Sequence, residues 1–180
     1  MEQNFERKHR NMICRRTRLW RKINHQRFNY FVTFTYADEK MTEQEFAKKL
    51  LNTLYHFSSR KGWLYIGAWE RGGETYRLHF HGLFYIPEGT LSGEMKILRD
   101  FDTRKKRMQT VQQNTFFAKR FGRNEFRPIN HISKMPQAVQ YLVKYIEKSG
   151  GKLIYSRGLY QYFVTDIMDE DIVCPYGLED

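Results

Sequence analysis

Two histidines and two tyrosines carry the chemistry that is most readily read from this sequence. His79 and His81 lie two positions apart in the apolar segment LHFHG, so on a β-strand both side chains point to the same face. Tyr141 and Tyr145 lie four positions apart, so on an α-helix they are one turn from each other. A metal ion held by imidazoles and facing two phenol nucleophiles is suited to breaking and rejoining a phosphodiester.

Glu70 is the candidate third ligand beside the histidines, and Glu74 is its rival. A tight turn at Gly72-Gly73 would leave Glu70 about 13 Å along the strand from His79, because each strand residue advances ~3.3 Å. Glu70 can therefore ligate only if a wide loop over about residues 71–78 joins the two strands. The alternative interpretation is that the two histidines lie on a polar sheet surface and hold no metal.

Two imidazoles and a carboxylate suit Mn²⁺ or Mg²⁺ when a substrate phosphate supplies further oxygen ligands. The same three ligands also suit a catalytic zinc ion. The ligand types alone therefore leave the identity of the metal open.

The tyrosines fall in a segment with two separate helical patterns. One is an apolar stripe, and the other combines the two phenols with two lysines; the stripe is Val139, Leu142, Val143 and Ile146, and the second set is Tyr141, Lys144, Tyr145 and Lys148. Aromatic residues at helical spacing usually belong to a core, but here another stripe already serves that purpose. A phenol with a pKa of about 10 is a poor nucleophile at neutral pH, so nearby ammonium groups and a metal would be needed to activate it.

The elements that must position these residues can be read from periodicity and turn signals. Residues 28–36 predict a strand, with one face formed by Phe31, Thr33 and Thr35. Thr42-x-x-Glu45 is a capping box that opens a helix, and Gly62 lies just beyond the end of that helix. Residues 63–70 and 76–86 predict two strands of a β-hairpin.

The second half of the chain is less regular. Residues 88–127 hold a basic cluster at 104–107 and an aromatic-basic segment at 116–123, and we expect this insert to be partly helical. A short strand at 126–132, a helix from Pro136 to about Lys148, and closing strands at 153–155 and 160–167 follow. The order β-α-β-β-insert-β-α-β predicts an α+β fold: an antiparallel ferredoxin-like (RRM-like) sheet with helices packed on one face. The other face would then be free to carry a site.

Composition limits the class of protein and of partner. The chain has 180 residues and a net charge of +11, which suits one domain with a polyanionic partner: nucleic acid first, an anionic membrane surface second. We expect a basic arm at 1–27, a domain at 28–167 and an acidic tail at 168–180. Cys14 and Cys174 form no disulfide or zinc pattern, and neither a membrane span nor a signal peptide is indicated, so reducing cytosol is the expected compartment. Whether the arm grips duplex DNA or stays disordered is left open.

The combined motifs resemble the HUH endonucleases, specifically the two-tyrosine rolling-circle replication initiators of small single-stranded DNA phages and plasmids. Residues 31–36 (FVTFTY) look like the family's first motif. His79-Phe80-His81 fits its metal motif, with Glu70 at the usual distance for a third ligand, and Tyr141-x-x-Lys144-Tyr145 fits its catalytic motif. The histidines precede the tyrosines, as in replication initiators and unlike conjugative relaxases. The resemblance covers about residues 28–167, except that the insert at 88–127 cannot be aligned.

The resemblance implies metal-dependent nicking of a specific single-stranded origin, which can be a hairpin, with a 5′-phosphotyrosine link and a free 3′-OH. It implies Mn²⁺ or Mg²⁺ as the cofactor, a host helicase and DNA polymerase as partners, no membrane, and the cytoplasm of a bacterial host. The site residues it implies are Tyr141 as first nucleophile, Tyr145 and Lys144; Glu70, His79 and His81 for the metal; and Thr33, Thr35, Arg77 and Lys148 for DNA.

Three alternatives remain. The chain can be read as a transposase of a mobile element with the same chemistry. A non-catalytic module would instead bind single-stranded nucleic acid by stacking bases on sheet aromatics, in the manner of an RRM; these would be Phe31, Tyr65, Phe80 and Tyr85. A zinc hydrolase is the third alternative, but it leaves the tyrosine face unexplained.

Overall fold

The computed structural model describes residues 2–24, 26–73, 76–102, 106–130, 135–149 and 152–159. The chain divides into a compact unit, Phe28–Leu159, and a second unit made of Met1–Arg27 and Tyr160–Asp180. The described part of the second unit contains helix α1 (Glu2–Asn24). The basic N-terminal segment, whose conformation the sequence leaves open, is therefore helical. The predicted closing strand at 160–167 and the acidic tail lie outside the described residues.

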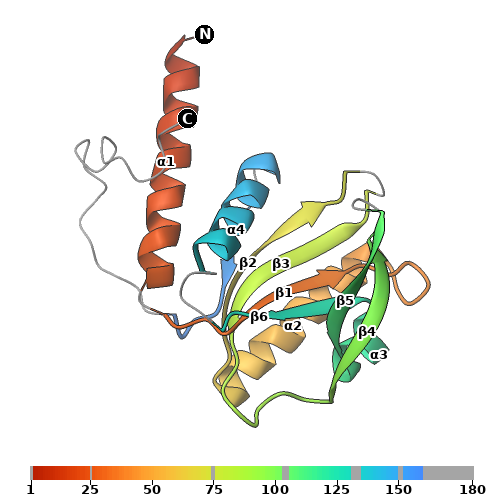
Figure 1. The fold of residues 1–180 in the computed structure, drawn as a ribbon. Coiled ribbons are helices and arrows are strands. Elements are labelled where there is room, and N and C mark those ends of the chain that lie inside the picture. Colours follow the sequence, from red (N-terminus) through yellow and green to blue (C-terminus); the bar gives the residue numbers. More distant parts are fainter. Residues whose placement is uncertain are drawn as a thin grey trace. The chain divides into compact units, whose positions relative to one another are not determined.

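A five-stranded antiparallel sheet with strand order β6-β1-β3-β2-β7 forms the centre of the compact unit (Figure 1). Its strands are β1 (Tyr30–Thr35), β2 (Leu64–Arg71), β3 (Leu78–Tyr85), β6 (Asn124–Pro128) and β7 (Ile154–Tyr155). Helix α2 (Glu43–Lys61) joins β1 to β2, and helix α3 (Thr115–Phe121) precedes β6. The succession β1-α2-β2-β3-α3-β6 with order β6-β1-β3-β2 is the ferredoxin-like arrangement, so the predicted fold class is confirmed.

Helix α2 begins and ends where its sequence signals predict. The Thr42 side chain accepts a hydrogen bond from the Glu45 backbone N–H, and the Glu45 carboxylate accepts one from the Thr42 N–H at 3.1 Å. Gly62 ends the helix with φ of +70°, a left-handed conformation that costs glycine little. The capping box thus satisfies backbone donors that the first helical turn would otherwise leave unpaired.

An aromatic core fills the space between α2, α3 and one face of the sheet. Its fully buried side chains include Phe34 and Phe80 from the sheet, Phe46 from α2, and Phe117 from α3. The Phe34 and Phe117 ring centroids lie 4.8 Å apart. Rings of this size bury a large apolar area, which is the main source of stability for the sheet and its two helices.

Helix α4 (Met135–Ser149) packs against β2 and β3. The α4 residues Val139 and Leu142 are fully buried, as are Ile66 and Leu83, whose positions alternate with those of the aromatic core. Because alternate strand residues point to opposite faces, α4 lies on the face opposite α2 and α3. The predicted apolar stripe of this helix is thus buried at Val139 and Leu142, and the second sheet face is partly covered as well as available for a site.

The insert differs from the expected partly helical segment. Beside α3, it contains a two-stranded hairpin made of β4 (Met95–Asp102) and β5 (Arg107–Asn114). The hairpin packs beside β6, and Asp100 forms an ion pair with Arg123 just before that strand. The Asn114 N–H donates to the Asn124 side-chain oxygen at 2.8 Å, which ties the end of β5 to the start of β6. The hairpin is thereby fixed next to one edge of the central sheet.

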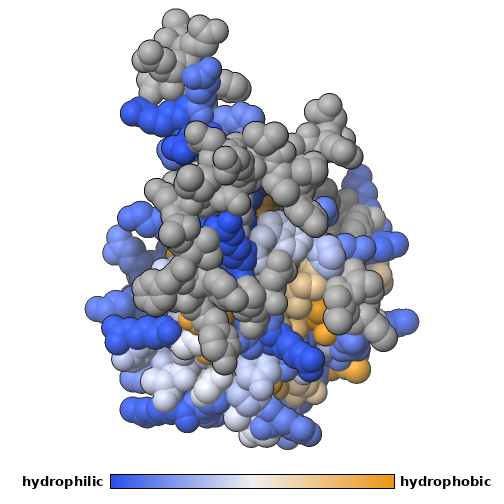
Figure 2. All heavy atoms as spheres, turned by 90° about the vertical axis from the view of Figure 1, so that its left-hand side faces the viewer, coloured by the Kyte–Doolittle hydropathy of each residue, from blue (hydrophilic) through white to orange (hydrophobic). Residues whose placement is uncertain are grey.

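Hydrophilic residues cover most of the described surface in Figure 2, with a smaller hydrophobic area beside them. The mean hydropathy of the chain is −0.73. Among the described residues, no helix combines the length and the apolar character that a membrane span requires.

Candidate active site

The loop between β2 and β3 determines whether Glu70 reaches the histidines. Strand β2 ends at Arg71 and β3 begins at Leu78, so the connection is wide, and Glu70 pairs directly with His79. The tight turn that would have separated them by about 13 Å does not form. The rival ligand Glu74 lies outside the described residues. The register thus brings Glu70, His79 and His81 together on one face.

The three side chains are close and largely shielded from water. The Oε2 atom of Glu70 lies 3.2 Å from Nε2 of His81, and these residues are only 8% and 7% exposed. The His79 and His81 rings stack with their centroids 5.7 Å apart and their planes inclined by 19°. His79 is partly exposed, so it forms the side of the group that solvent or substrate can approach.

Two threonines on the neighbouring strand hold the imidazoles. Thr33 Oγ1 lies 3.0 Å from Nδ1 of His81, and Thr35 Oγ1 lies 3.1 Å from Nδ1 of His79. The β1–β3 register produces both contacts, because it pairs Thr33 with His81 and Thr35 with His79. A hydroxyl can donate or accept, so each threonine can serve either imidazole tautomer. Sequence reasoning assigned these threonines to DNA, whereas the structure places their hydroxyls on the histidines.

Both imidazoles are held in the neutral form at neutral pH. Burial, followed by the neighbouring His81, lowers the pKa of His79 to about 4, although Glu70 opposes this shift. Burial also lowers the pKa of His81, against the raising effect of its hydrogen bond to Glu70. A neutral imidazole is the form that binds a metal ion, so little proton competition is expected near pH 7.

This pKa shift predicts a loss of stability in acid when divalent metal is absent. Between pH 6.5 and about 4 the unfolded chain binds the His79 proton and the folded chain does not, so the free energy of unfolding falls as the pH falls. We expect His79→Gln to remove roughly 1–2 kcal/mol of the decrease between pH 7 and pH 4.5. Urea unfolding at both pH values, in chelator, measures it. His56→Gln on α2 is the control, and an unchanged pH dependence in His79→Gln would contradict the prediction.

The donor set has the composition of a divalent-cation site. In the part of the chain that the structure describes, no three His, Cys, Asp or Glu side chains form a ready metal-binding group. Glu70 and His81 instead contact each other, so a cation would replace that contact. The threonines occupy the Nδ1 atoms and so leave ligation to the Nε2 atoms. Two neutral imidazoles and one carboxylate fit Mn²⁺ or Mg²⁺ once substrate oxygens complete the coordination.

The predicted nucleophiles lie on helix α4, which packs against the two strands that carry Glu70, His79 and His81. The side chains of Tyr141, Tyr145 and Lys148 are outside the described residues. Lys144 on the same helix is exposed. The backbone thus places the tyrosine positions on an element adjoining the histidine strands.

Arg77, predicted to contact DNA, is exposed just before β3 and lies 3.8 Å from Asp38. Its positive charge also contributes to lowering the pKa of His79. Sequence reasoning missed Glu125 and Arg127 on β6, whose charges act on His81. Only the strand register, which pairs Thr33 with Glu125, brings them to this face, so no local sequence signal points to them.

The alternative in which sheet aromatics stack nucleic-acid bases is not supported by the burial of these residues. Phe80 is fully buried, and Phe31 and Tyr65 are each 5% exposed. Phe31 stacks on the His81 ring at 6.2 Å between centroids and so supports the histidine from within. Three of the four proposed stacking residues are therefore inaccessible to a base.

Comparison with known proteins now identifies the family. No curated protein and no solved structure matches the chain. A family model for the replication-associated protein ORF2 matches residues 29–150, which is more than half of the chain and includes β1, the histidine strands and nearly all of α4. The chain therefore belongs to this ORF2 family of replication-associated proteins.

Proposed function

We propose that this protein is a rolling-circle replication initiator of the HUH type that nicks single-stranded origin DNA and later rejoins strands. The observation that carries the proposal is the packing of α4 against β2 and β3, because the helix with the tyrosine pair then adjoins the strands with Glu70, His79 and His81. The membership in a replication-associated family gives this arrangement its biological setting. It favours a replication initiator over the transposase alternative.

In this proposal Glu70, His79 and His81 hold Mn²⁺ or Mg²⁺. The bound cation would polarise the scissile phosphate and stabilise the negative charge that develops on its oxygens. The burial of Glu70 and His81 strengthens any interaction between these side chains and a cation, because little water is present to screen it.

A tyrosine of α4, with Tyr141 as the first candidate, supplies the nucleophile. Its phenol loses a proton, and the phenolate oxygen forms a bond to phosphorus while the bond from phosphorus to the 3′ oxygen breaks. The 3′ oxygen takes up a proton, which leaves a free 3′-OH and a 5′-phosphotyrosine. The phosphodiester is exchanged and not hydrolysed, so a second phenol such as Tyr145 can attack a new junction. The ammonium group of Lys144, one residue before Tyr145, favours the phenolate.

The partners follow from this chemistry. The net charge of +11 attracts a polyanionic strand, and the free 3′-OH requires a DNA polymerase to extend it. We propose that a host helicase opens the duplex and that the protein acts in the cytoplasm of a bacterial host.

Covalent capture of DNA tests the proposal. The full chain is incubated with Mn²⁺ and single-stranded fragments that tile its own replicon, and adducts are detected by denaturing electrophoresis. We expect an adduct that needs Mn²⁺, disappears with chelator, and maps by mass spectrometry to the peptide containing Tyr141 and Tyr145. The Tyr141→Phe/Tyr145→Phe double variant should form none, and Tyr55→Phe on α2 serves as the matched control. An adduct in the double variant, or none in the wild-type chain, would refute the proposal.

A further inference from the structure

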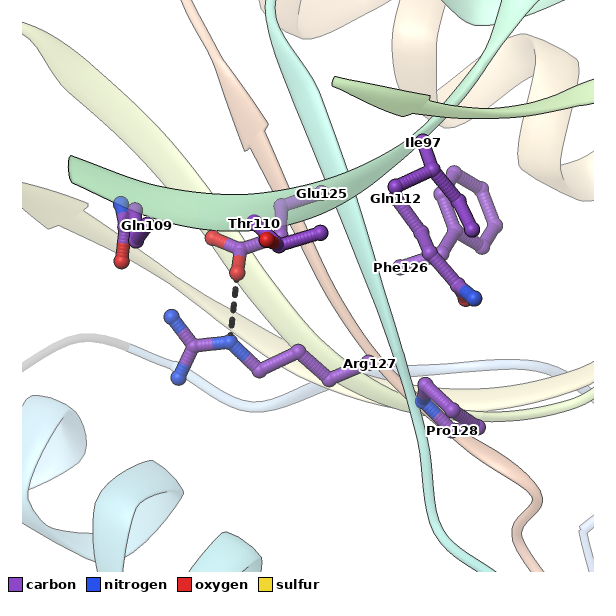
Figure 3. Close-up of a pocket in the computed structure, with 8 residues that line it drawn as sticks. All are labelled: Ile97, Gln109, Thr110, Gln112, Glu125, Phe126, Arg127 and Pro128. Atoms are coloured by element: carbon purple, nitrogen blue, oxygen red, sulfur yellow. Dashed lines mark hydrogen bonds and ion pairs between the residues drawn. The ribbon is translucent and has the colours of Figure 1, made fainter. Parts of the chain in front are cut away.

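A groove of about 380 Å³ lies between the β4–β5 hairpin and the edge strand β6 (Figure 3). Polar side chains line much of it: Thr110 and Gln112 come from β5, and Glu125 and Arg127 come from β6. Ile97 of β4 contributes an apolar wall. The groove therefore combines hydrogen-bonding groups with a nonpolar surface, which suits a flat ligand that has polar edges.

The groove continues the face of the sheet that carries the histidines. Thr33 contacts His81 and pairs with Glu125 on the next strand, so one cross-strand row runs from β3 through β1 to the groove. Neighbouring strands lie about 4.8 Å apart, which puts the β6 side chains roughly 10 Å from the β3 histidines. A substrate strand reaching the histidines thus passes beside the groove.

One face of the hairpin presents apolar side chains to solvent beside this groove. Ile97, Phe101 and Met108 are 69%, 50% and 57% exposed. The register pairs Phe101 with Met108, and strand alternation places Ile97 on the same face. Arg99 lies between Ile97 and Phe101 and shares that face. An exposed aromatic ring with an arginine nearby is the pattern of surfaces that stack unpaired bases and attract phosphates.

We propose that the groove binds an unpaired base of the DNA strand next to the phosphate that is cleaved. The amide of Gln112 would hydrogen-bond the edge of the base, Ile97 would contact its plane, and Phe101 would stack a neighbouring base. The inference rests on the proposed nicking function for the position of the base relative to the cleaved phosphate.

Charge and lining favour DNA over a protein partner. The Glu125 carboxylate accepts a hydrogen bond from Arg127 Nε at 2.7 Å, so the acid in the groove is paired with a cation. Arg99 and Arg107 on the hairpin add positive charge near it, and the chain as a whole carries +11. A second copy of this basic chain would meet electrostatic repulsion here, whereas a polyanion would not.

Binding in chelator tests the groove independently of nicking. The probe is a fluorescein-labelled oligothymidylate about 20 nucleotides long, a length that spans more than one binding site, with 5-iodouracil at one position for photocrosslinking. We expect Ile97→Ala/Gln112→Ala and Phe101→Ala each to weaken binding about tenfold. The crosslinks should map to residues 95–128. Tyr55→Ala on α2 removes a comparably exposed ring, 45% exposed, and should bind as the wild-type chain does.

Unchanged affinity in the groove variants, with crosslinks elsewhere, would overturn the inference. So would a change of oligomeric mass in Phe101→Ala without a change in DNA affinity, because the face would then bind a second copy. A chain that forms the covalent adduct but has no groove-dependent binding refutes the groove alone. Groove-dependent binding without any adduct supports the groove as a single-stranded DNA site and refutes the proposed nicking.

Discussion

A His81→Gln variant is expected to lose Mn²⁺ binding and to nick single-stranded DNA on the order of 1,000-fold more slowly. His81 is 7% exposed, stacks on His79 and contacts Glu70, so every candidate ligand depends on its position. A cation that polarises the scissile phosphate contributes several kcal/mol, and ~1.4 kcal/mol corresponds to a tenfold change in rate. Isothermal titration with Mn²⁺ and single-turnover nicking measure the two effects.

Because His81 is buried, its variant must be distinguished from an unfolded chain. The partly exposed His79→Gln should show the same loss of metal binding with a smaller change in thermal stability. His56→Gln on α2 should retain both binding and nicking. Wild-type Mn²⁺ affinity in both folded site variants would exclude this group as the metal site.

The threonines allow a graded version of the same test. Thr33→Val keeps the side-chain shape but removes the hydroxyl that contacts Nδ1 of His81 at 3.0 Å. Groups that orient metal ligands in this way change metal affinity by about 10–100-fold, so the variant should bind Mn²⁺ more weakly without losing it. Thr53→Val removes a hydroxyl that donates to the Lys49 carbonyl on α2, and it provides the matched control. Equal affinities in the two variants would argue for a purely structural role of Thr33.

The sequence predicts those parts of the site that depend on short spacings. The two-residue separation of His79 and His81 fixes a common strand face, and the capping box before α2 fixes the start of that helix. Glu70 depends instead on the width of a loop, because a tight turn would shift its register by several residues. The composition of residues 71–77 allows either loop, so only the folded structure decides between them.

The remaining differences arise from contacts between distant segments. The β4–β5 hairpin has polar residues on both faces and exposes Ile97 and Phe101, so it lacks the alternation that marks a half-buried strand. Helix α4 lies on the opposite side of the sheet from α2, and its own apolar stripe fits packing on either face. The role of Thr33 follows from pairing with a residue 48 positions away. Local patterns give the elements, and tertiary pairing decides which side chains meet.

A Gly67→Ala variant is expected to lose about 2–3 kcal/mol of stability, because Gly67 faces Gly82 across the β2–β3 ladder beneath an aromatic ring. An added Cβ would lie 2.5 Å from the Phe80 ring and 2.6 Å from the His81 carbonyl oxygen. The ring can rotate only within a packed core, and the carbonyl belongs to the ladder, so the two strands must separate locally. For a chain of this size the midpoint of thermal unfolding should fall by roughly 5–10 °C.

The same substitution connects the core to the site, because the carbonyl it displaces belongs to His81 itself. We therefore expect Gly67→Ala to weaken Mn²⁺ binding as well as folding, although it removes no ligand. Gly73→Ala in the β2–β3 loop meets no atom within 4 Å and should leave the unfolding midpoint nearly unchanged. If calorimetry gave the two alanine variants the same midpoint, the close approach of β2 and β3 at Gly67 would not be what fixes the register of Glu70 against His79.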